Sequence, residues 1–470
     1  MILVSLLFVA INAYLFLQDF YYLLALPFVL IIIYLTFYQL HLAFLLIAFL
    51  TPLSINLEEF TDGKMGLFLP TEPILFGLML WVIFKQTYQK FIQKGIFRHP
   101  LTLVLGAYLL WMFITSITSE LPLVSFKYLL MKSWFIIPMI LLASQLFYEK
   151  SERIIHFLWL FSTAMVAIIS FTLIRHYTYG FGEKEGHWVM EPFFKDHTIY
   201  GAVVAINLFF LLALYQYKKH SPLTQLTLLI FIAITLVGLY FSYTRGAWLS
   251  IVVAFFVWLF IKFKIKFKYL LITGVLALTL LFSFWDQLQM ALAKNRSEHT
   301  TEQFDERIRS ATNITSDASN LERLNRWDAA WRMYKERPVF GFGPGTYAFE
   351  YAPFQDPDKL TIISTNFGDG GNAHSEYLGP LAEMGTLGFL LVVMFVANLY
   401  YKGITLYIKH PDQKQKTLLL FLVLAMVTYF FHGLLNNYLD TDKAAVPVYG
   451  VCAIIIALEL RLNKSISEGQ

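Results

Sequence analysis

Residues 197–262 read HTIYGAVVAINLFFLLALYQYKKHSPLTQLTLLIFIAITLVGLYFSYTRGAWLSIVVAFFVWLFIK, and three apolar runs fill this stretch. The runs cover 197–216, 223–243 and 246–262, and only a short basic turn and the break around Arg245 interrupt them. A helix that crosses a bilayer needs roughly 20 mostly apolar residues. The stretch therefore predicts three consecutive transmembrane helices.

Apolar runs of this kind recur along the chain, in about fourteen segments by the same length rule. The other segments are 2–17, 22–38, 41–56, 68–86, 101–118, 128–147, 154–174, 268–285, 386–408, 417–438 and 443–461. The run that starts at Met1 lacks a small-residue cleavage site and precedes further runs, so we interpret it as a retained helix rather than a signal peptide. The prediction is an all-α polytopic transmembrane helical bundle of about 12–14 spans.

The composition of the 470 residues excludes several other classes of protein. Hydrophobic residues make up 57% and charged residues only 14%, whereas soluble domains carry about 25% charged residues. The single cysteine, Cys452, excludes a disulfide scaffold. A formal net charge of +4, spread along the chain, is too small for a nucleic-acid binder.

Lysine and arginine gather in five segments, and these predict the orientation of the spans, because cytoplasmic loops carry an excess of both residues. The segments are Lys85–Arg98, Tyr217–His220, Lys262–Lys268, Lys409–Lys416 and the tail after Arg461. All five fall on one side if the spans alternate as predicted. We assign that side, with both termini, to the cytoplasm. The opposite side receives residues 58–62, 175–196, 286–385 and 440–442.

Residues 286–385 form the one long hydrophilic stretch, too long for a plain connection. Ser319 and Glu322 have the spacing of a capping box at the start of a helix. Apolar residues at helical spacing then predict an amphipathic helix of about four turns that Pro338 ends; these residues are Leu324, Trp327, Trp331 and Tyr334. We interpret the glycines of Gly341-Phe-Gly-Pro-Gly345 as a tight turn. Residues 351–372 are expected to be irregular.

Two residues at the predicted outer face suggest chemistry. Arg245 lies between two spans where positive charge is normally depleted. It is either a positional anchor or a ligand for an anion, and phosphate fits the planar fork of a guanidinium group. His374 lies just before a span, so it is either a structural histidine of the interface or a group that transfers protons near neutral pH.

The other polar residues of this face allow a weaker interpretation. Lys195 and His197 come directly before a span and are predicted to face the same cavity as Arg245. The histidines of this loop match no metal-ligand spacing, so we expect no metal. The polar residues of the last outer turn are expected to be solvated; they are Asn436, Asn437, Asp440, Asp442 and Lys443.

Five motifs follow one another in a fixed order in the second half of the chain. They are Ser242-Tyr-Thr-Arg245-Gly-Ala-Trp248, Arg326-Trp-Asp-Ala-Ala-Trp331, Arg337-Pro-Val-Phe-Gly-Phe-Gly-Pro-Gly345, His374-Ser-Glu-Tyr-Leu378 and Glu383-Met-Gly-Thr-Leu-Gly388. In this order they resemble the O-antigen ligase / O-antigen polymerase superfamily of bacterial membrane glycosyltransferases. The motif-bearing part covers residues 190–460. One departure is Ser375, because the family often has Asn after the histidine.

The resemblance implies a GT-C-like helical membrane enzyme whose donor is a glycan linked to polyprenyl (undecaprenyl) diphosphate. Matched position by position, the phosphate-binding arginine of the family's short turn falls on Arg245, and its loop arginine falls on Arg326, with Arg323 as the alternative register. Its catalytic histidine falls on His374, the expected general base. Two arginines could neutralise the leaving group, so no metal or other cofactor is expected. Further candidates for the substrate cavity are Lys195, His197, Glu376, Trp327 and Trp331.

This resemblance also predicts the organisation of the chain and its place in the cell. Residues 1–190 would be N-terminal transmembrane helices, and 191–470 the ligase-like catalytic region, with 286–385 as its periplasmic loop. The enzyme would be a multi-pass protein of the bacterial inner membrane with its active site facing the periplasm. A single dominant outer loop favours the ligase branch, which transfers O-antigen to lipid A–core in lipopolysaccharide biosynthesis.

Three alternatives stay open at this point. A polysaccharide polymerase of the same superfamily would use a second lipid-linked glycan as acceptor, and a protein O-oligosaccharyltransferase would use a Ser or Thr hydroxyl. A lipid or solute transporter would need polar or broken helices in mid-membrane and an internal repeat, and the sequence shows neither.

Overall fold

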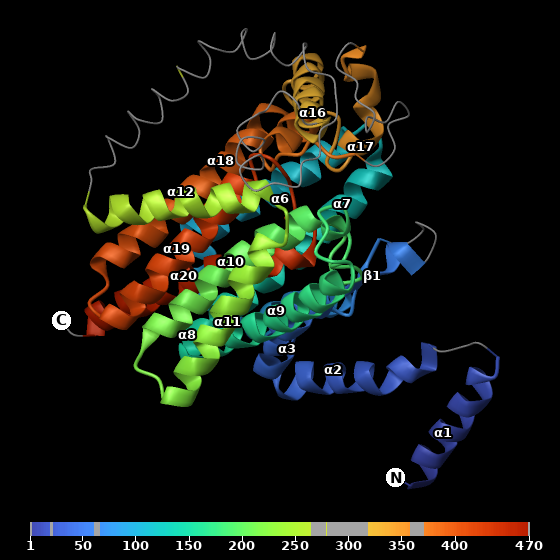
Figure 1. Cartoon of the computed structure of the whole chain (residues 1–470), viewed down its shortest axis with the longest axis vertical. Helices are drawn as coiled ribbons and strands as arrows, with labels where there is room; N and C mark the ends of the chain where they lie inside the picture. Colours follow the sequence, from blue (N-terminus) through green and yellow to red (C-terminus); the bar gives the residue numbers. More distant parts are fainter. Residues whose placement is uncertain are drawn as a thin grey trace.

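The computed structural model describes residues 2–18, 22–60, 66–264, 279, 318–357 and 371–468. Most of these residues are helical, and the strands among them form one short antiparallel pair, β1 (Ile55–Asn56) with β2 (Phe68–Leu69). Figure 1 shows the helices packed side by side in a bundle. The predicted all-α helical bundle is therefore confirmed.

The first half of the bundle runs from α1 to α9. Its helices are α1 (Ile2–Phe16), α2 (Leu26–Tyr38), α3 (Leu40–Leu53), α4 (Thr71–Gln89), α5 (Lys94–Arg98), α6 (Pro100–Ile117), α7 (Pro122–Ile137), α8 (Ala143–Glu149) and α9 (Glu152–Thr178). A π-helical turn, Pro138–Leu142, joins α7 to α8. The later helices are α10 (His197–Tyr217), α11 (Pro222–Tyr240), α12 (Arg245–Lys262), α16 (Ala318–Glu336), α17 (Tyr347–Glu350), α18 (Leu378–Lys409), α19 (Gln413–His432) and α20 (Asp442–Glu468).

Within the described residues, nine helices are long and apolar enough to cross a membrane. They are α6, the continuous segment Pro122–Glu149, α9 to α12, and α18 to α20. The first three predicted spans correspond to shorter apolar helices, and 68–86 corresponds to α4. The predicted span 268–285 lies outside the described residues. The chain is a multi-pass membrane protein, and the boundary at residue 190 stays a prediction.

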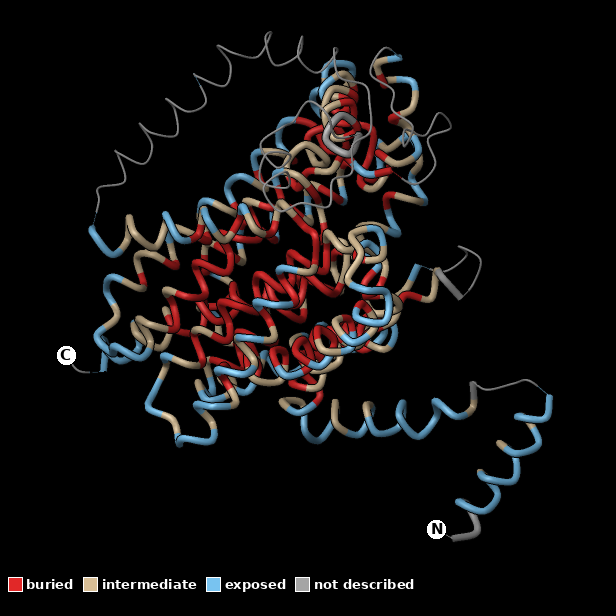
Figure 2. The backbone as a smooth tube through the Cα atoms, in the orientation of Figure 1, coloured by how far each residue is buried: buried red, intermediate tan, exposed pale blue. Residues whose placement is uncertain are grey.

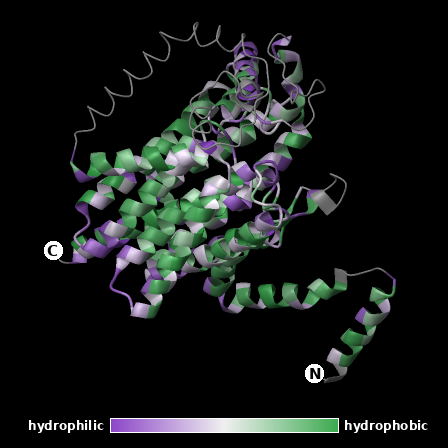
Figure 3. Ribbon diagram, in the orientation of Figure 1, coloured by the Kyte–Doolittle hydropathy of each residue, from purple (hydrophilic) through white to green (hydrophobic). Residues whose placement is uncertain are grey.

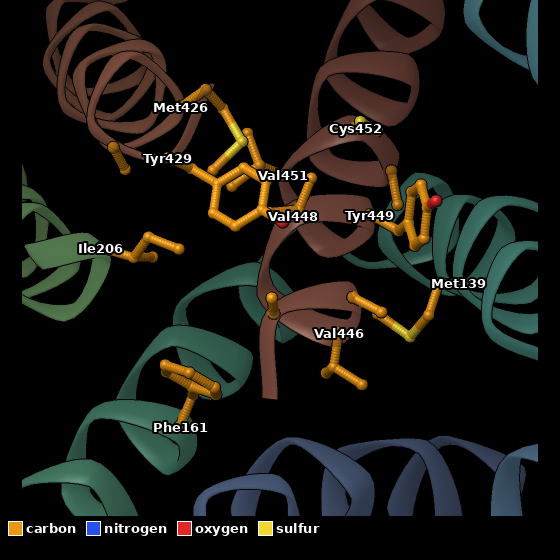
Figure 4. Close-up of a cluster of buried hydrophobic side chains, with 14 of the residues drawn as sticks. Met139, Phe161, Ile206, Met426, Tyr429, Val446, Val448, Tyr449, Val451 and Cys452 are labelled. Atoms are coloured by element: carbon orange, nitrogen blue, oxygen red, sulfur yellow. The ribbon is translucent and has the colours of Figure 1, made fainter. Parts of the chain in front are cut away.

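The centre of the bundle is built around α20. This helix is buried on all sides from Asp442 to Leu458, as expected for a helix that neighbours surround completely. Figure 4 shows its side chains Val446, Val448 and Cys452 among residues from several neighbouring helices, and the buried colour is concentrated at this centre in Figure 2. In contrast, α2 has no buried residue and projects from the bundle in Figure 1.

The two ends of the bundle differ. At the end where the C-terminus lies, α20 contacts the start of α6 and the end of α8: His99 lies 2.9 Å from Glu459, and Arg461 donates to the Tyr148 carbonyl at 2.6 Å. Polar colour marks this end in Figure 3 and also the opposite end, where α16 and α17 lie. The apolar band between them matches a bilayer-spanning body.

The last outer turn is buried rather than solvated, so that expectation was wrong for most of its residues. Lys443 donates three hydrogen bonds of 2.7–3.1 Å to the carbonyls of Thr51, Pro52 and Ser54, at the end of α3. Asp442 accepts a hydrogen bond from the Ser54 hydroxyl at 2.5 Å. Carbonyls at a helix end lack intrahelical partners, so the buried ammonium group joins α3 to α20.

The loop helix α16 confirms the prediction of a helix that ends before Pro338, but its buried face differs from the predicted one. Ala329, Ala330 and Met333 are fully buried, whereas Trp331 is 45% exposed. Ala329, Ala330 and Met333 pack in one buried cluster with Ala382 of α18, and the Tyr334 hydroxyl lies 3.1 Å from Thr386 Oγ1 of the same helix. Of the predicted apolar face, Trp331 lies on the open side. Ser319 of the predicted capping box lies outside the described side chains.

The glycine-rich turn after α16 docks on α18. Gly343 donates from its backbone to the Glu383 carbonyl at 2.8 Å, and Thr386 donates to Pro338 at 2.9 Å. A Cβ atom on Gly341 would overlap the backbone of Glu383, and Gly341 also has a positive φ of 68°. Gly385 interrupts α18 at the same contact with a φ of 66°. The turn is therefore a docking element as well as a tight turn.

Candidate functional site

The N-terminal ends of α10 and α12 meet at the end of the bundle near α16. The Thr244 hydroxyl donates to the His197 carbonyl at 2.6 Å, and Asp196 caps α10 by accepting from the backbone of Thr198 and Ile199. His197 and Arg245 are the first residues of their helices. Helix N-termini carry partial positive charge, so an arginine there gains no stability from its own helix. The N-terminus of α12 and the guanidinium group of Arg245 both attract an anion.

Arg323 and His432 lie within electrostatic range of His197 or Arg245. The charges of Arg245 and Arg323 both act on His197, and the charge of Arg323 also acts on His432. A Cβ atom on Gly246 would lie 3.4 Å from His432 Nε2, which places the start of α12 against the end of α19. We call the following six residues the basic cluster: His197, Arg245, Arg323, Arg326, His374 and His432.

His374 lies on a loop, residues 371–377, that several hydrogen bonds hold in place. Its backbone N–H donates to Asn372 Oδ1 at 3.0 Å, and its carbonyl accepts from Trp327 Nε1 at 3.3 Å. Its φ of 46° is left-handed, a conformation that costs a non-glycine residue about 1–3 kcal/mol and persists where the surroundings enforce it. The loop therefore presents the imidazole in one backbone conformation.

Arg326 is part of the support of this loop. It is only 7% exposed, its Nε donates to Glu322 at 2.7 Å, and its Nη1 donates to the Asn372 carbonyl at 3.1 Å. A Cβ atom on Gly371 would overlap the guanidinium group. Arg323, one turn earlier on α16, is less buried than Arg326.

Asn436 connects His374 to His432. Its Oδ1 lies 3.2 Å from His374 Nδ1, and its Nδ2 lies 3.0 Å from His432 Nε2. An amide oxygen only accepts, so His374 Nδ1 carries the hydrogen and its Nε2 keeps the lone pair. An amide nitrogen only donates, so His432 Nε2 must accept. His432 Nε2 and His374 Nδ1 thus use the two ends of the Asn436 amide, and in this arrangement the hydrogen of His374 lies on Nδ1.

The electrostatic surroundings keep His374 uncharged at neutral pH. Burial and the nearby charges of Arg326 and Arg323 lower the pKa of His374 to about 4. The hydrogen bond with Asn436 opposes this shift only in part. A neutral imidazole with an available Nε2 lone pair has the form that a general base requires.

Ser375, which follows His374 in the chain, has a structural role. Its hydroxyl accepts from the backbone N–H groups of Tyr377 and Leu378, each at 3.3 Å, and so supports the start of α18. The side-chain amide next to the histidine is supplied instead by Asn436, which lies 62 residues further along the chain. The structural neighbour of His374 thus differs from its sequence neighbour.

The other side of the 371–377 loop borders a cavity of about 160 Å³. Residues on both sides of His374 line it, including Asn372, Ser375 and Glu376, but His374 does not. We call it the acidic cavity, because its ionisable residues other than tyrosine are three carboxyl groups and one lysine: Glu376, Glu383, Asp440 and Lys132. Burial raises the pKa of both Glu376 and Asp440.

The predicted site residues are distributed over three places. Glu376 lines the acidic cavity, whereas His197 belongs to the basic cluster and Trp327 donates to the His374 carbonyl. Lys195 is 63% exposed and pairs with Glu58 at 3.2 Å. Trp331 is exposed and lies beside Tyr334 and Lys335. The structure thus brings neither Lys195 nor Trp331 into contact with His374.

Sequence reasoning missed His432, Asn436 as a partner of His374, and Lys132. Each signal was present but weak: His432 and Lys132 are ionisable residues inside apolar runs, where such residues are expensive and often functional. Only the packing of α19 against the 371–377 loop reveals that Asn436 faces His374.

Comparison with known proteins supports the same region of the chain. Residues 228–393 match a family model described as O-antigen ligase. The matched segment contains Arg245, Arg323, Arg326 and His374, and it ends before His432 and Asn436. No curated protein matches the chain. The match confirms the predicted resemblance to the O-antigen ligase superfamily.

Proposed function

Taking the place of this chain in the O-antigen ligase superfamily as the premise, we propose that it transfers a glycan from polyprenyl (undecaprenyl) diphosphate to a hydroxyl acceptor. The proposed acceptor is lipid A–core, as in the ligase branch of the superfamily. The observation that carries the proposal is the convergence of a neutral His374 with Arg245 and Arg323 at one end of a membrane bundle.

In the proposed mechanism His374 Nε2 takes the proton of the acceptor hydroxyl. The acceptor oxygen forms a bond to the anomeric carbon as the bond between that carbon and the phosphate oxygen breaks. The polyprenyl diphosphate leaves with the bonding electron pair. Preorganised donors aimed at developing charge supply much of the rate enhancement in such reactions.

Arg245 and Arg323 are proposed to bind the diphosphate. Guanidinium groups suit this task because they make bidentate hydrogen bonds to phosphate, and the first turn of α12 would add its N–H groups. Arg326 is proposed to act through the loop instead, because its guanidinium group is already bonded to Glu322 and Asn372. Diphosphate is a good leaving group, so the two arginines suffice without a metal ion.

The test is a transfer assay with the purified full chain and a glycan linked to undecaprenyl diphosphate. One reaction contains lipid A–core, a second contains only the donor, and a third contains a Ser/Thr-rich acceptor protein. Glycan on lipid A–core supports the ligase, a longer lipid-linked glycan indicates a polymerase, and glycosylated protein indicates the third branch. The proposal would be contradicted if no product formed in any of the three reactions. Loss of activity in EDTA, restored by a divalent cation, would contradict the metal-free mechanism.

The basic cluster is proposed to face the periplasm of a bacterial inner membrane. A Cys452→Ala background with Glu336→Cys on α16 tests this, because Glu336 is exposed. An impermeant thiol reagent should label it in cells whose outer membrane alone is permeable. The matched control Lys414→Cys, exposed at the other end of the bundle, should react only after lysis of the inner membrane. The reverse pattern would overturn the orientation.

A further inference from the structure

One residue that lines the acidic cavity, Lys132, is unusual for its position. This side chain is only 4% exposed and lines the cavity. Lys132 is ten residues after Pro122, the first residue of α7, about 15 Å along the helix at 1.5 Å per residue. An ionisable residue at such depth is costly and usually marks a functional site.

The ammonium group of Lys132 makes no hydrogen bond or ion pair with any residue that the structure describes. The Tyr128 ring lies near it, with its centroid 5.3 Å from Nζ. An ammonium group offers three donors, and a buried donor without an acceptor costs free energy. The donors therefore face the cavity with no acceptor of their own in the described parts of the chain.

The acceptors around the cavity are also only half used. Glu376 Oε1 accepts from the Tyr429 hydroxyl and from the backbone of Tyr438 and Leu439. Glu383 Oε1 accepts from the Tyr347 backbone at 3.1 Å. Glu383 also accepts from the Gly345 backbone. Within the described ranges no hydrogen bond uses the second oxygen of Glu376, and Asn437 Oδ1 is buried without a partner.

Aromatic residues complete the wall of the cavity. Tyr108, Tyr128, Tyr347 and Tyr449 line it together with small residues such as Gly345 and Gly379. A pocket with apolar and aromatic walls and a few convergent polar groups is typical of small-molecule sites. The ligand must offer hydroxyl groups to the carboxyl oxygens and oxygen acceptors to Lys132, and it must also present apolar C–H faces to the tyrosines.

We propose that the acidic cavity binds one pyranose sugar, uncharged or carrying an amino group. A pyranose has hydroxyl groups that both donate and accept, and it has apolar faces. Three carboxyl groups against one lysine disfavour a uronic acid. This inference rests on the proposed function, since the sugar would belong to the donor glycan or to the acceptor. The 371–377 loop would then couple sugar binding to the position of His374.

Binding is tested with free sugars and the purified full chain, without donor or acceptor lipid. The probes are methyl glucopyranoside, glucosamine and glucuronate, measured by saturation-transfer NMR and titration. We expect saturable binding of the first two and much weaker binding of glucuronate. Lys132→Met and Glu383→Gln should each weaken binding at least about tenfold, because charge-assisted hydrogen bonds are lost. Glu383→Gln keeps an oxygen for Tyr347, so the fold is preserved.

Lys127→Met is the matched control, because Lys127 is exposed on the same helix and should bind sugar like the wild type. The proposal would be overturned if no sugar bound saturably. It would also be overturned if the Lys132→Met variant bound sugar as tightly as the wild type. Binding of calcium alone, lost in the same variants, would overturn it in favour of a cation site.

His374→Ala separates this proposal from the proposed function, because it should still bind the free sugar while transfer is lost. Sugar binding in a protein that transfers no glycan would contradict only the proposed function. The source of the sugar follows from transfer kinetics of Lys132→Met: a raised KM for the lipid-linked glycan assigns the site to the donor, and a raised KM for lipid A–core assigns it to the acceptor.

Discussion

The basic cluster and the acidic cavity lie on opposite sides of one seven-residue loop, yet their chemistry is opposite. The cluster combines arginines and neutral histidines with the N-termini of α10 and α12. The cavity combines carboxyl groups and a buried lysine with tyrosine rings. The basic cluster suits an anionic leaving group, and the acidic cavity suits an uncharged polyol. The comparison suggests that one loop serves two parts of a composite substrate.

The largest expected effect separates the two regions at His374. General-base catalysis contributes about 10²–10⁴-fold, so His374→Ala should lower the transfer rate by that factor while donor binding and melting temperature change little. The control is His156→Ala, because His156 is exposed on α9. A stable His374→Ala protein with near-normal transfer would remove the histidine from the mechanism.

A smaller effect is expected for the arginines of the cluster. Arg245→Lys and Arg323→Lys should each lower kcat/KM by about 10²-fold, in the range of a lost oxyanion donor, because an ammonium group cannot replace the bidentate fork. Arg332→Lys is the matched control, since Arg332 is on α16 but pairs with Asp328 and Asp356. Equal activity of Arg245→Lys and the control would mean that Arg245 is only an anchor.

The tautomer of His374 offers a finer test. His432→Leu should lower kcat about tenfold, the value of one hydrogen bond, because the Asn436 amide can then rotate and present its NH₂ group to His374. Asn436→Asp has two equivalent oxygens, so adding it to His432→Leu should restore most of the rate. If the double variant is no faster than His432→Leu alone, His432 has a structural role only.

The smallest expected effect is on the pH profile. With a pKa of about 4, His374 stays neutral as pH falls from 8 to 6, so kcat/KM should be flat there and fall to half of its plateau only near pH 4. Asn436→Asp places a carboxylate beside the imidazole, which favours its charged form, and should move this fall to higher pH. A wild-type fall centred near 6.5 would contradict the account of burial and arginine charge.

Much of the fold could be predicted from the sequence because apolar length and helical spacing depend on local composition. The spans from α6 onward and the end of α16 before Pro338 follow from these rules. The buried face of α16 was predicted wrongly. The large apolar side chains, such as Trp331, suggested the buried face, but the fully buried residues are the small ones, Ala329 and Ala330.

The candidate site was predictable only where residues carry a motif. Arg245 and His374 were predicted from their motifs along the chain, and their role stays a prediction. Asn436 and Lys443 were taken as solvated because they occur in a polar turn, but three-dimensional packing buries both. No local pattern could report that α19 brings Asn436 to a loop 62 residues earlier.

The contact of Lys443 with α3 has a consequence for biosynthesis. The carbonyls of Thr51, Pro52 and Ser54 receive their donor from a residue 389–392 positions later in the chain. During translation α3 is therefore made long before the residue that joins it to α20. Of the three carbonyls, only that of Thr51 has a local donor within the described part of the chain, in Ser54, so the end of α3 reaches its final hydrogen bonding only after α20 has been made.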